Sequence, residues 1–149
     1  MSRNKIWLGP ADGSNAKALL VEGAAVDAIV PGSLVVRSAS GLATSGLAAT
    51  VFNSETIVAQ EQGSHVGAVI TDAYTIGETA KGVKARSGEF LLVRVAASQN
   101  ITSKGVALSS NGDGTLKIAL TDGTEQILFY SEEIVNTGGS VALVVVSKA

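Results

Sequence analysis

The sequence predicts an all-β protein, a small barrel or a sandwich of two sheets, for three reasons. Val, Thr, Gly and Ser are abundant, and these residues suit pleated strands and tight turns. Short apolar runs are separated by turn signals at about the 8–12-residue spacing typical of barrels and sandwiches. No window sustains a helical apolar period with capping residues at its ends.

The length of 149 residues suits one domain. Residues 1–14 are predicted to form an extended N-terminal arm, because Gly9-Pro10 and Asp12-Gly13 interrupt regular structure. Residues 15–149 are then a single β-rich domain.

Eleven short strands are expected within this domain. They span residues 17–22, 28–30, 33–37, 50–52, 56–59, 67–70, 90–96, 106–108, 116–120, 126–130 and 141–146. The strand at 90–96 has the clearest signal, since it is rich in β-branched residues and contains no breaker. The Asn-Gly-Asp-Gly run at 111–114 predicts a hairpin turn. Residues 16–26 are the best helical alternative, and residues 131–135 allow one short helix.

Charge is sparse and balanced, with 11 Lys+Arg against 13 Asp+Glu and a net charge of −2. No basic patch is large enough to follow a nucleic-acid backbone, so no nucleic-acid partner is expected. No signal peptide and no apolar run of 18 residues are visible, so no membrane partner is expected either. The low charge favours burial against another protein.

The residues that enzymes use for chemistry are scarce. The chain has no cysteine, and His65 is its only histidine, in what is predicted to be a turn. No G-x-S-x-G elbow, P-loop or dinucleotide-binding glycine pattern is present. The run at 111–115 lacks the spaced acids of a calcium loop. We therefore expect no enzymatic activity, no metal and no cofactor.

The N-terminal residues are the first candidates for binding. Trp7 is the only tryptophan and stands between Ile6 and Leu8, and a large aromatic beside aliphatic side chains is a common interface anchor. Arg3 and Lys5 could then meet an acidic surface. The alternative, that Trp7 folds back onto its own barrel, is equally open.

The C-terminal run at 141–146 is the second candidate, because it is apolar on both faces. A central strand of the core explains this pattern slightly better. In the alternative, one face covers the core while Val141, Leu143 and Val145 meet a symmetry mate.

The segment from Gly67 to Ala80 resembles the G-x-x-I-x-D-x-Y-T-x-G-[DE] segment of capsid decoration (cement) proteins of tailed bacteriophages. The resemblance continues through residues 88–95 and 101–117, and residues 26–35 fit the opening of such proteins. About two-thirds of the chain is covered. These motifs consist mostly of turn and strand residues.

The resemblance implies a small β-barrel or β-tulip-like fold and a structural virion protein. Such a protein binds the outer surface of the capsid lattice as a homotrimer and stabilises the mature head. Its partners would be the major capsid protein and its own copies. Its location would be the capsid exterior, after synthesis in the host cytoplasm. N-terminal segments of the family often reach a neighbour, which implies docking by Ile6, Trp7 and Leu8.

Two other functions remain open from the sequence. Another virion or appendage subunit, of a tail, baseplate or pilus, has similar composition. A β-barrel carbohydrate-binding module needs an aromatic platform, and aromatic residues make up only 4% of this chain.

Overall fold

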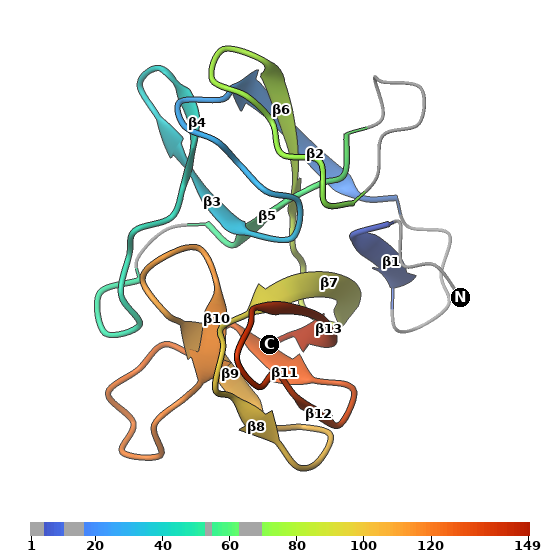
Figure 1. Ribbon diagram of the computed structural model, residues 1–149, viewed down its shortest axis with the longest axis vertical. Helices are drawn as coiled ribbons and strands as arrows, with labels where there is room; N and C mark the ends of the chain where they lie inside the picture. Colours follow the sequence, from blue (N-terminus) through green and yellow to red (C-terminus); the bar gives the residue numbers. More distant parts are fainter. Residues whose placement is uncertain (1–4, 11–16, 53–54, 63–69) are drawn as a thin grey trace.

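The computed structural model describes residues 5–10, 17–52, 55–62 and 70–149 (Figure 1). All helical or extended elements assigned within these residues are β-strands, and none is a helix. The strands are β1 (Trp7–Pro10), β2 (Leu19–Ala24), β3 (Leu34–Ser38), β4 (Gly41–Thr44), β5 (Ile57–Ala59), β6 (Thr79–Lys84), β7 (Glu89–Val95), β8 (Asn100–Ile101), β9 (Ala107–Ser110), β10 (Leu116–Ile118), β11 (Phe129–Ser131), β12 (Val135–Asn136) and β13 (Ala142–Lys148). The predicted all-β class is confirmed.

Five strands of the C-terminal half close into a barrel in the order β7-β10-β9-β11-β13, with β13 returning to β7. The antiparallel ladder between β13 and β7 runs from Ala142 opposite Val95 to Ser147 opposite Phe90. A parallel pairing of Leu116 with Val95 closes the other side of β7. β1 adds an antiparallel strand to β7 outside the closed ring. The predicted small barrel is therefore present.

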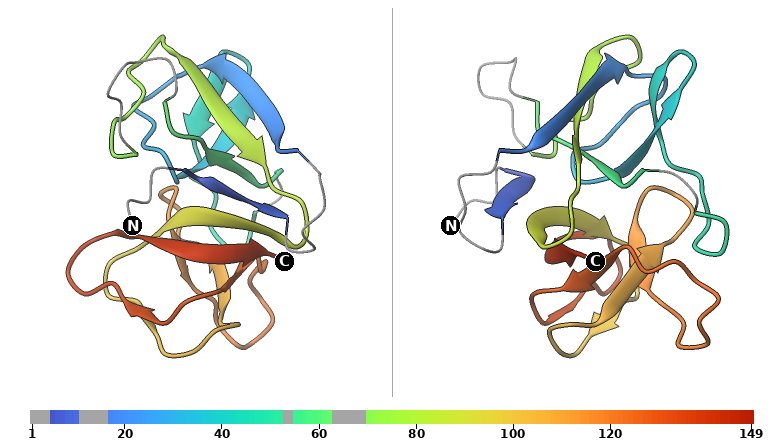
Figure 2. Two further views of the ribbon diagram at one scale, coloured as in Figure 1. Left: turned by 90° about the vertical axis from the view of Figure 1, so that its right-hand side faces the viewer. Right: turned by 180° about the vertical axis from the view of Figure 1, so that it is seen from behind.

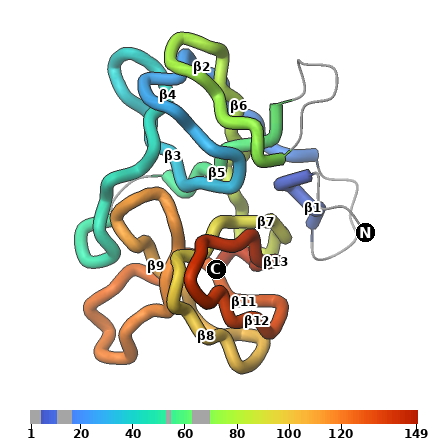
Figure 3. The backbone as a smooth tube through the Cα atoms, viewed as in Figure 1, coloured from blue at the N-terminus to red at the C-terminus, as the bar shows by residue number. Residues whose placement is uncertain are grey.

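A second sheet lies above the barrel in Figure 1 and has the order β2-β6-β5-β3-β4. It curls, because an isolated parallel bridge between Ala25 and Leu42 joins its first strand to its last. β8 and β12 form a separate two-stranded ribbon. Figure 3 follows the chain from β6 of the upper sheet into β7 of the barrel.

One apolar core joins the two sheets. Its larger cluster contains Leu91 and Phe129 of the barrel together with Leu34, Val58 and Val83 of the upper sheet, and all five are fully buried. A smaller cluster fills the upper sheet itself. Since burial of apolar area is the main stabilising contribution to folding, the shared cluster holds the sheets together as one folded unit.

β7 connects the parts of the molecule because three different segments bond to its outer edge. The Leu92 N–H donates to the Ile6 carbonyl at 2.8 Å, and the Arg94 N–H donates to the Gly32 carbonyl at 2.9 Å. Beyond the strand, the Ala96 N–H donates to the Leu116 carbonyl at 2.8 Å. The N-terminal strand, the upper sheet and the barrel thus meet along one strand.

The predicted hairpin turn at 111–114 joins β9 to β10 as expected. Gly114 in this turn has a φ of +90°, and its carbonyl accepts the Leu34 N–H at 2.8 Å. A Cβ atom at this position would lie 2.5 Å from Cγ2 of Thr44. Glycine therefore allows both the turn conformation and the close approach of the barrel to the upper sheet.

Most predicted strands correspond to observed ones, and three expectations fail. Residues 28–30 form no strand, and only Ile29 makes an isolated bridge, to Tyr74. Residues 50–52 form a turn and bend. The helix allowed at 131–135 is wrong, because Ser131 ends β11 and Val135 begins β12. Of the strand expected at 67–70, residues 67–69 lie outside the described residues, and Ile70 is in a turn.

Candidate functional site

The N-terminal docking residues are largely built into the fold. Residues 7–10, expected in an arm, form β1 on the edge of β7. The side chain of Ile6 is fully buried in the core, so its predicted role in docking is wrong. Its N–H also donates to Oε2 of Glu61 at 2.9 Å. Lys5 is exposed and Leu8 is 45% exposed, while Arg3 lies outside the described residues.

Trp7 is half-buried and held by a carboxylate. Its Nε1 donates to Oε2 of Glu89 at 2.8 Å, and the side chain of Glu89 is only 4% exposed. Arg86 adds a second donor from its backbone N–H at 2.7 Å and a third from its guanidinium at 3.0 Å. Burial alone would raise the pKa of Glu89, but the hydrogen bonds from Arg86 and Trp7 outweigh it and lower that pKa. The fold-back alternative for Trp7 agrees with this arrangement.

The predicted subunit-interface residues lie on or beside β13, between β7 and β11. Val144 and Val146 are fully buried in the barrel, as the core interpretation expects. Leu143 and Val145 are half-buried, and Val141 is 43% exposed. A Cβ atom on Gly32 would lie 2.6 Å from Cδ2 of Leu143, so Leu143 already packs on this chain's own backbone. Their contact with a symmetry mate stays a prediction.

Three exposed leucines lie on two edge strands that the sequence did not single out. β1 and β2 are the first strands of their sheets. Leu8 of β1 is 45% exposed, and Leu19 and Leu20 of β2 are 44% and 54% exposed. Both strands lie on the right-hand side in Figure 1, and both face the viewer in the left panel of Figure 2. We call Leu8, Leu19 and Leu20 the leucine edge.

The backbone of β2 also lacks a described strand partner over part of this edge, before the end of the strand at Ala24 and Ala25 meets Gly41 and Leu42 of β4. The Ala25 N–H donates to the Glu78 carbonyl at 2.8 Å, which extends the ladder between β2 and β6. Since hydrogen-bonding direction alternates along an antiparallel strand, the main-chain groups of Leu20 and Glu22 point away from β6. No described strand pairs with them there. The leucine edge therefore combines apolar side chains with backbone groups that pair with none of the described strands.

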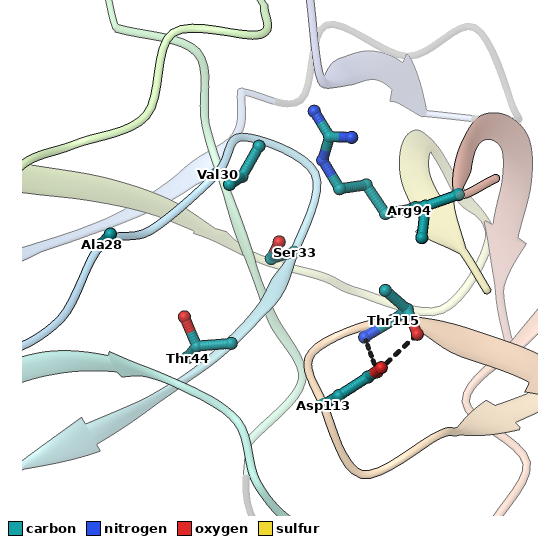
Figure 4. A pocket seen from close by; sticks show the side chains of 8 residues that line it. Ala28, Val30, Ser33, Thr44, Arg94, Asp113 and Thr115 are labelled. Carbon is teal, nitrogen blue, oxygen red and sulfur yellow. Dashed lines mark hydrogen bonds between the residues drawn. The ribbon is translucent and has the colours of Figure 1, made fainter. Parts of the chain in front are cut away.

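A groove lies between the upper sheet and the barrel (Figure 4). It has a volume of about 310 Å³. Its lining comes from both parts of the molecule: Ala28, Val30, Ser33, Thr44, Arg94, Asp113, Thr115 and Val141. In Figure 4, the Arg94 guanidinium lies toward Val30, away from the side chains of Asp113 and Thr115.

The two charged side chains of the groove, Asp113 and Arg94, differ in their hydrogen-bond partners. Asp113 accepts hydrogen bonds from the Thr115 N–H at 3.0 Å and from the Thr115 hydroxyl. Burial would raise the pKa of Asp113, but these bonds outweigh it and lower the pKa. The Arg94 Nε donates to the Pro31 carbonyl at 2.8 Å, and burial lowers the pKa of its guanidinium. No carboxylate of the described residues forms an ion pair with Arg94.

The residues that carry the resemblance to decoration proteins shape the upper sheet. Residues 75–78 form a turn in which the Glu78 N–H donates to the Thr75 carbonyl at 3.0 Å. Gly77 has a φ of +91°, as the third residue of a type II turn requires. Tyr74 is 2% exposed, and its hydroxyl donates to the Gln60 carbonyl at 2.8 Å. Tyr74 and the turn at 75–78 therefore have structural roles in the upper sheet.

Among the described residues, no three His, Cys, Asp or Glu side chains gather as metal ligands would. His65 lies outside those residues. None of the described segments contains a helix long and apolar enough to cross a membrane. No protein-family model and no curated protein matches this sequence.

Proposed function

We propose that this chain is a structural virion protein that binds the outer surface of a phage capsid as a homotrimer and stabilises the mature head. The observation that carries the proposal is the leucine edge. Exposed apolar side chains beside unpaired strand backbone favour pairing with another chain, and proteins usually cover or charge such edges. Here the edge keeps three exposed leucines.

A second copy of this chain is the occupant we assign to the leucine edge. The backbone of β2 at Leu20 and Glu22 can extend its sheet with an edge strand of a neighbouring copy. Glu22 and Lys81 form an exposed pair at 3.9 Å, so both signs of charge stand beside the leucines. Pairing of β2 with β2 would be a two-fold contact and would close a dimer. A trimer needs a contact between two different surfaces, here β2 of one copy with another edge of the next copy, which three-fold rotation repeats until the ring closes.

Trimerisation explains how a chain with few charges could hold a capsid firmly. A trimer engages three lattice sites together, so modest contacts of each subunit give durable attachment. Protein that binds only the intact shell shifts the equilibrium toward that shell. The resemblance of residues 67–80 to decoration proteins supports the same assignment independently of the leucine edge.

The experiment compares Leu20→Ser with Leu120→Ser, because these leucines have similar exposure, 54% and 56%, and Leu120 lies after β10. Light scattering should give three chain masses for the wild type and for Leu120→Ser. Leu20→Ser should dissociate at about tenfold higher concentration, as expected when a contact residue is truncated. Cryo-electron microscopy of capsids assembled without this chain, then mixed with it, should show lattice sites filled by the wild type.

Two results would refute the proposal. One is a wild-type monomer at all concentrations that leaves such capsids bare. The other is an equal effect of the two serine substitutions on the trimer, which would remove the leucine edge from the interface.

A further inference from the structure

Arg94 occupies an unusual position for a cation. It is the only charged residue inside the apolar run from Phe90 to Val95, and it is half-buried at the junction of the two sheets. Its backbone N–H is bound to Gly32 and its Nε to Pro31. The backbone bond fixes the strand and the Nε bond holds the side chain against the same loop, so less conformational entropy is lost when a ligand binds.

No ion pair joins the Arg94 guanidinium to a carboxylate within the part of the chain that the structure describes. Half-buried charges are normally compensated by a neighbouring opposite charge. Glu125, whose side chain is 3% exposed, is paired in this way with Lys117 at 2.6 Å. Arg94 has only a neutral carbonyl as its side-chain partner among those residues. No hydrogen bond from the two terminal nitrogens of its guanidinium to a described residue is seen.

The surrounding groove suits a side chain with its flanking backbone. Its walls come from five stretches of chain, and the backbone bonds between Leu34 and Gly114 and between Arg94 and Gly32 hold the two sheets together around it. A volume of about 310 Å³ is at the lower end of ligand-binding hollows. Ala28, Val30 and Val141 supply apolar surface, and Ser33 and Thr44 supply hydroxyl groups.

The charges that line the groove favour one chemical class of ligand. A single guanidinium whose Nε is already occupied can still bind a carboxylate end-on through its two terminal nitrogens. A phosphate dianion usually calls for more positive charge, and Arg94 is the only cation among the lining residues. Asp113 would moreover repel a second negative charge at the far side. One carboxylate would neutralise Arg94 without placing a second negative charge beside Asp113.

We infer that this groove binds an acidic side chain, Asp or Glu, from the protein on which the chain docks, with Arg94 as the residue that recognises the carboxylate. The identity of that protein as the capsid lattice rests on the proposed function. The carboxylate specificity of the groove does not, and it can be measured on the isolated chain.

The first test uses the unaltered protein and two small probes. N-acetyl-glutamate amide and N-acetyl-glutamine amide have the same shape and differ in charge. Titration followed by amide NMR should move the signals of Gly32, Ser33, Arg94 and Thr115 with the glutamate probe only. The shifts should saturate in the millimolar range and weaken as salt is added. Equal shifts with both probes, or none in these residues, would overturn the inference.

The second test removes the charge. Arg94→Gln should abolish the glutamate-dependent shifts, while Arg37→Gln, which removes an exposed arginine paired with Glu55 at 2.8 Å, should leave them unchanged. Melting temperatures establish that both variants are folded. On capsids, Arg94→Gln should lower occupancy about tenfold or more without changing the mass of the trimer.

The outcomes separate the two proposals. Wild-type protein that ignores capsids but distinguishes the probes would refute the capsid function and retain the groove. Capsid binding that is equal for wild type and Arg94→Gln would refute the docking role of the groove.

Discussion

The indole Nε1 of Trp7 lies 2.8 Å from Oε2 of Glu89, and this hydrogen bond attaches the N-terminal strand to the first residue of β7. Arg86, which also bonds to Glu89, donates from its guanidinium to the Lys17 carbonyl as well. The Glu89 carboxylate and its partner Arg86 thus link β1, the segment before β2 and the start of β7. The leucine edge is held in place by this arrangement.

Replacing Trp7 by Phe should lower stability without weakening assembly. Phe keeps most of the apolar surface but leaves Oε2 of Glu89 without its indole donor. A hydrogen bond to a charged group contributes about 1.5–3 kcal/mol, so the free energy of unfolding in urea should fall by about that amount. Circular dichroism is the suitable measurement, since the variant has no tryptophan. Loss of trimer or of capsid binding at unchanged stability would instead support Trp7 as a docking anchor.

Acid should destabilise the protein. Burial raises the pKa of Glu89, but the hydrogen bonds from Arg86 and Trp7 have the larger effect, so the pKa is lowered. The pKa of Glu125 is lowered mainly by its hydrogen bond from Lys117. A carboxylate with a lowered folded pKa stabilises the fold above its unfolded pKa, which is about 4.3 for Glu. That stability is lost as the pH falls through the folded pKa.

The free energy of unfolding should therefore be nearly constant from about pH 7 to 5 and decrease below about pH 4. Urea denaturation at a series of pH values measures this dependence. Glu125→Gln should make the acid loss smaller, because one of the responsible carboxylates is gone. Stability that rises on acidification would contradict the assignment of these carboxylates.

Gly114→Ala should destabilise the junction between the barrel and the upper sheet. Alanine at a φ of +90° is strained, and its Cβ would lie 2.5 Å from Cγ2 of Thr44. We expect a loss of about 1–3 kcal/mol, read as a lower melting temperature. Gly46→Ala is the control, because a Cβ there meets no atom within 4 Å. Equal melting temperatures of the two variants would show that the approach of Gly114 to Thr44 is unimportant.

The sequence predicts the strands whose own residues favour them. β7 and β13 are rich in Val and Leu, and both were expected. β4 (GLAT) and β6 (TAKGVK) were not, because Gly, Ala and Lys are poor strand formers. β6 forms because β2 and β5 flank it. A Cβ atom on its Gly82 would lie 2.6 Å from Cγ2 of Ile57, so glycine there admits close packing.

The sequence allowed a helix at 131–135 that the structure does not contain, and the reason is specific. Ser-Glu-Glu resembles the start of a capped helix, but both carboxylates bond to β13 instead. The Ser147 hydroxyl donates to Oε1 of Glu132 at 2.7 Å, and the Val145 N–H donates to Oε1 of Glu133 at 2.9 Å. These partners are distant in sequence, so local patterns could not reveal them.

The candidate binding surfaces were also beyond the reach of local patterns. An arginine within an apolar strand is a visible signal at Arg94, but the groove around it needs segments from residue 28 to residue 141. The leucine edge depends on which strands end their sheets. Sheet order is set by long-range pairing and not by any single segment.

Tyr74→Phe distinguishes folding from docking in the segment that resembles decoration proteins. Tyr74 is 2% exposed, and its hydroxyl donates to the Gln60 carbonyl, while the backbone of Tyr74 pairs with Ile29. Removing the hydroxyl leaves the carbonyl of half-buried Gln60 without this donor, which should cost about 1–3 kcal/mol in urea unfolding. Trimer mass and capsid occupancy should not change in conditions where the variant is folded. Thr75→Val, which removes the exposed hydroxyl bonded to Glu78 at 2.6 Å, is the neighbouring control and should cost less. If Tyr74→Phe instead lowered capsid occupancy at wild-type stability, the segment would contact the partner directly, and its structural role in the upper sheet would not account for the resemblance.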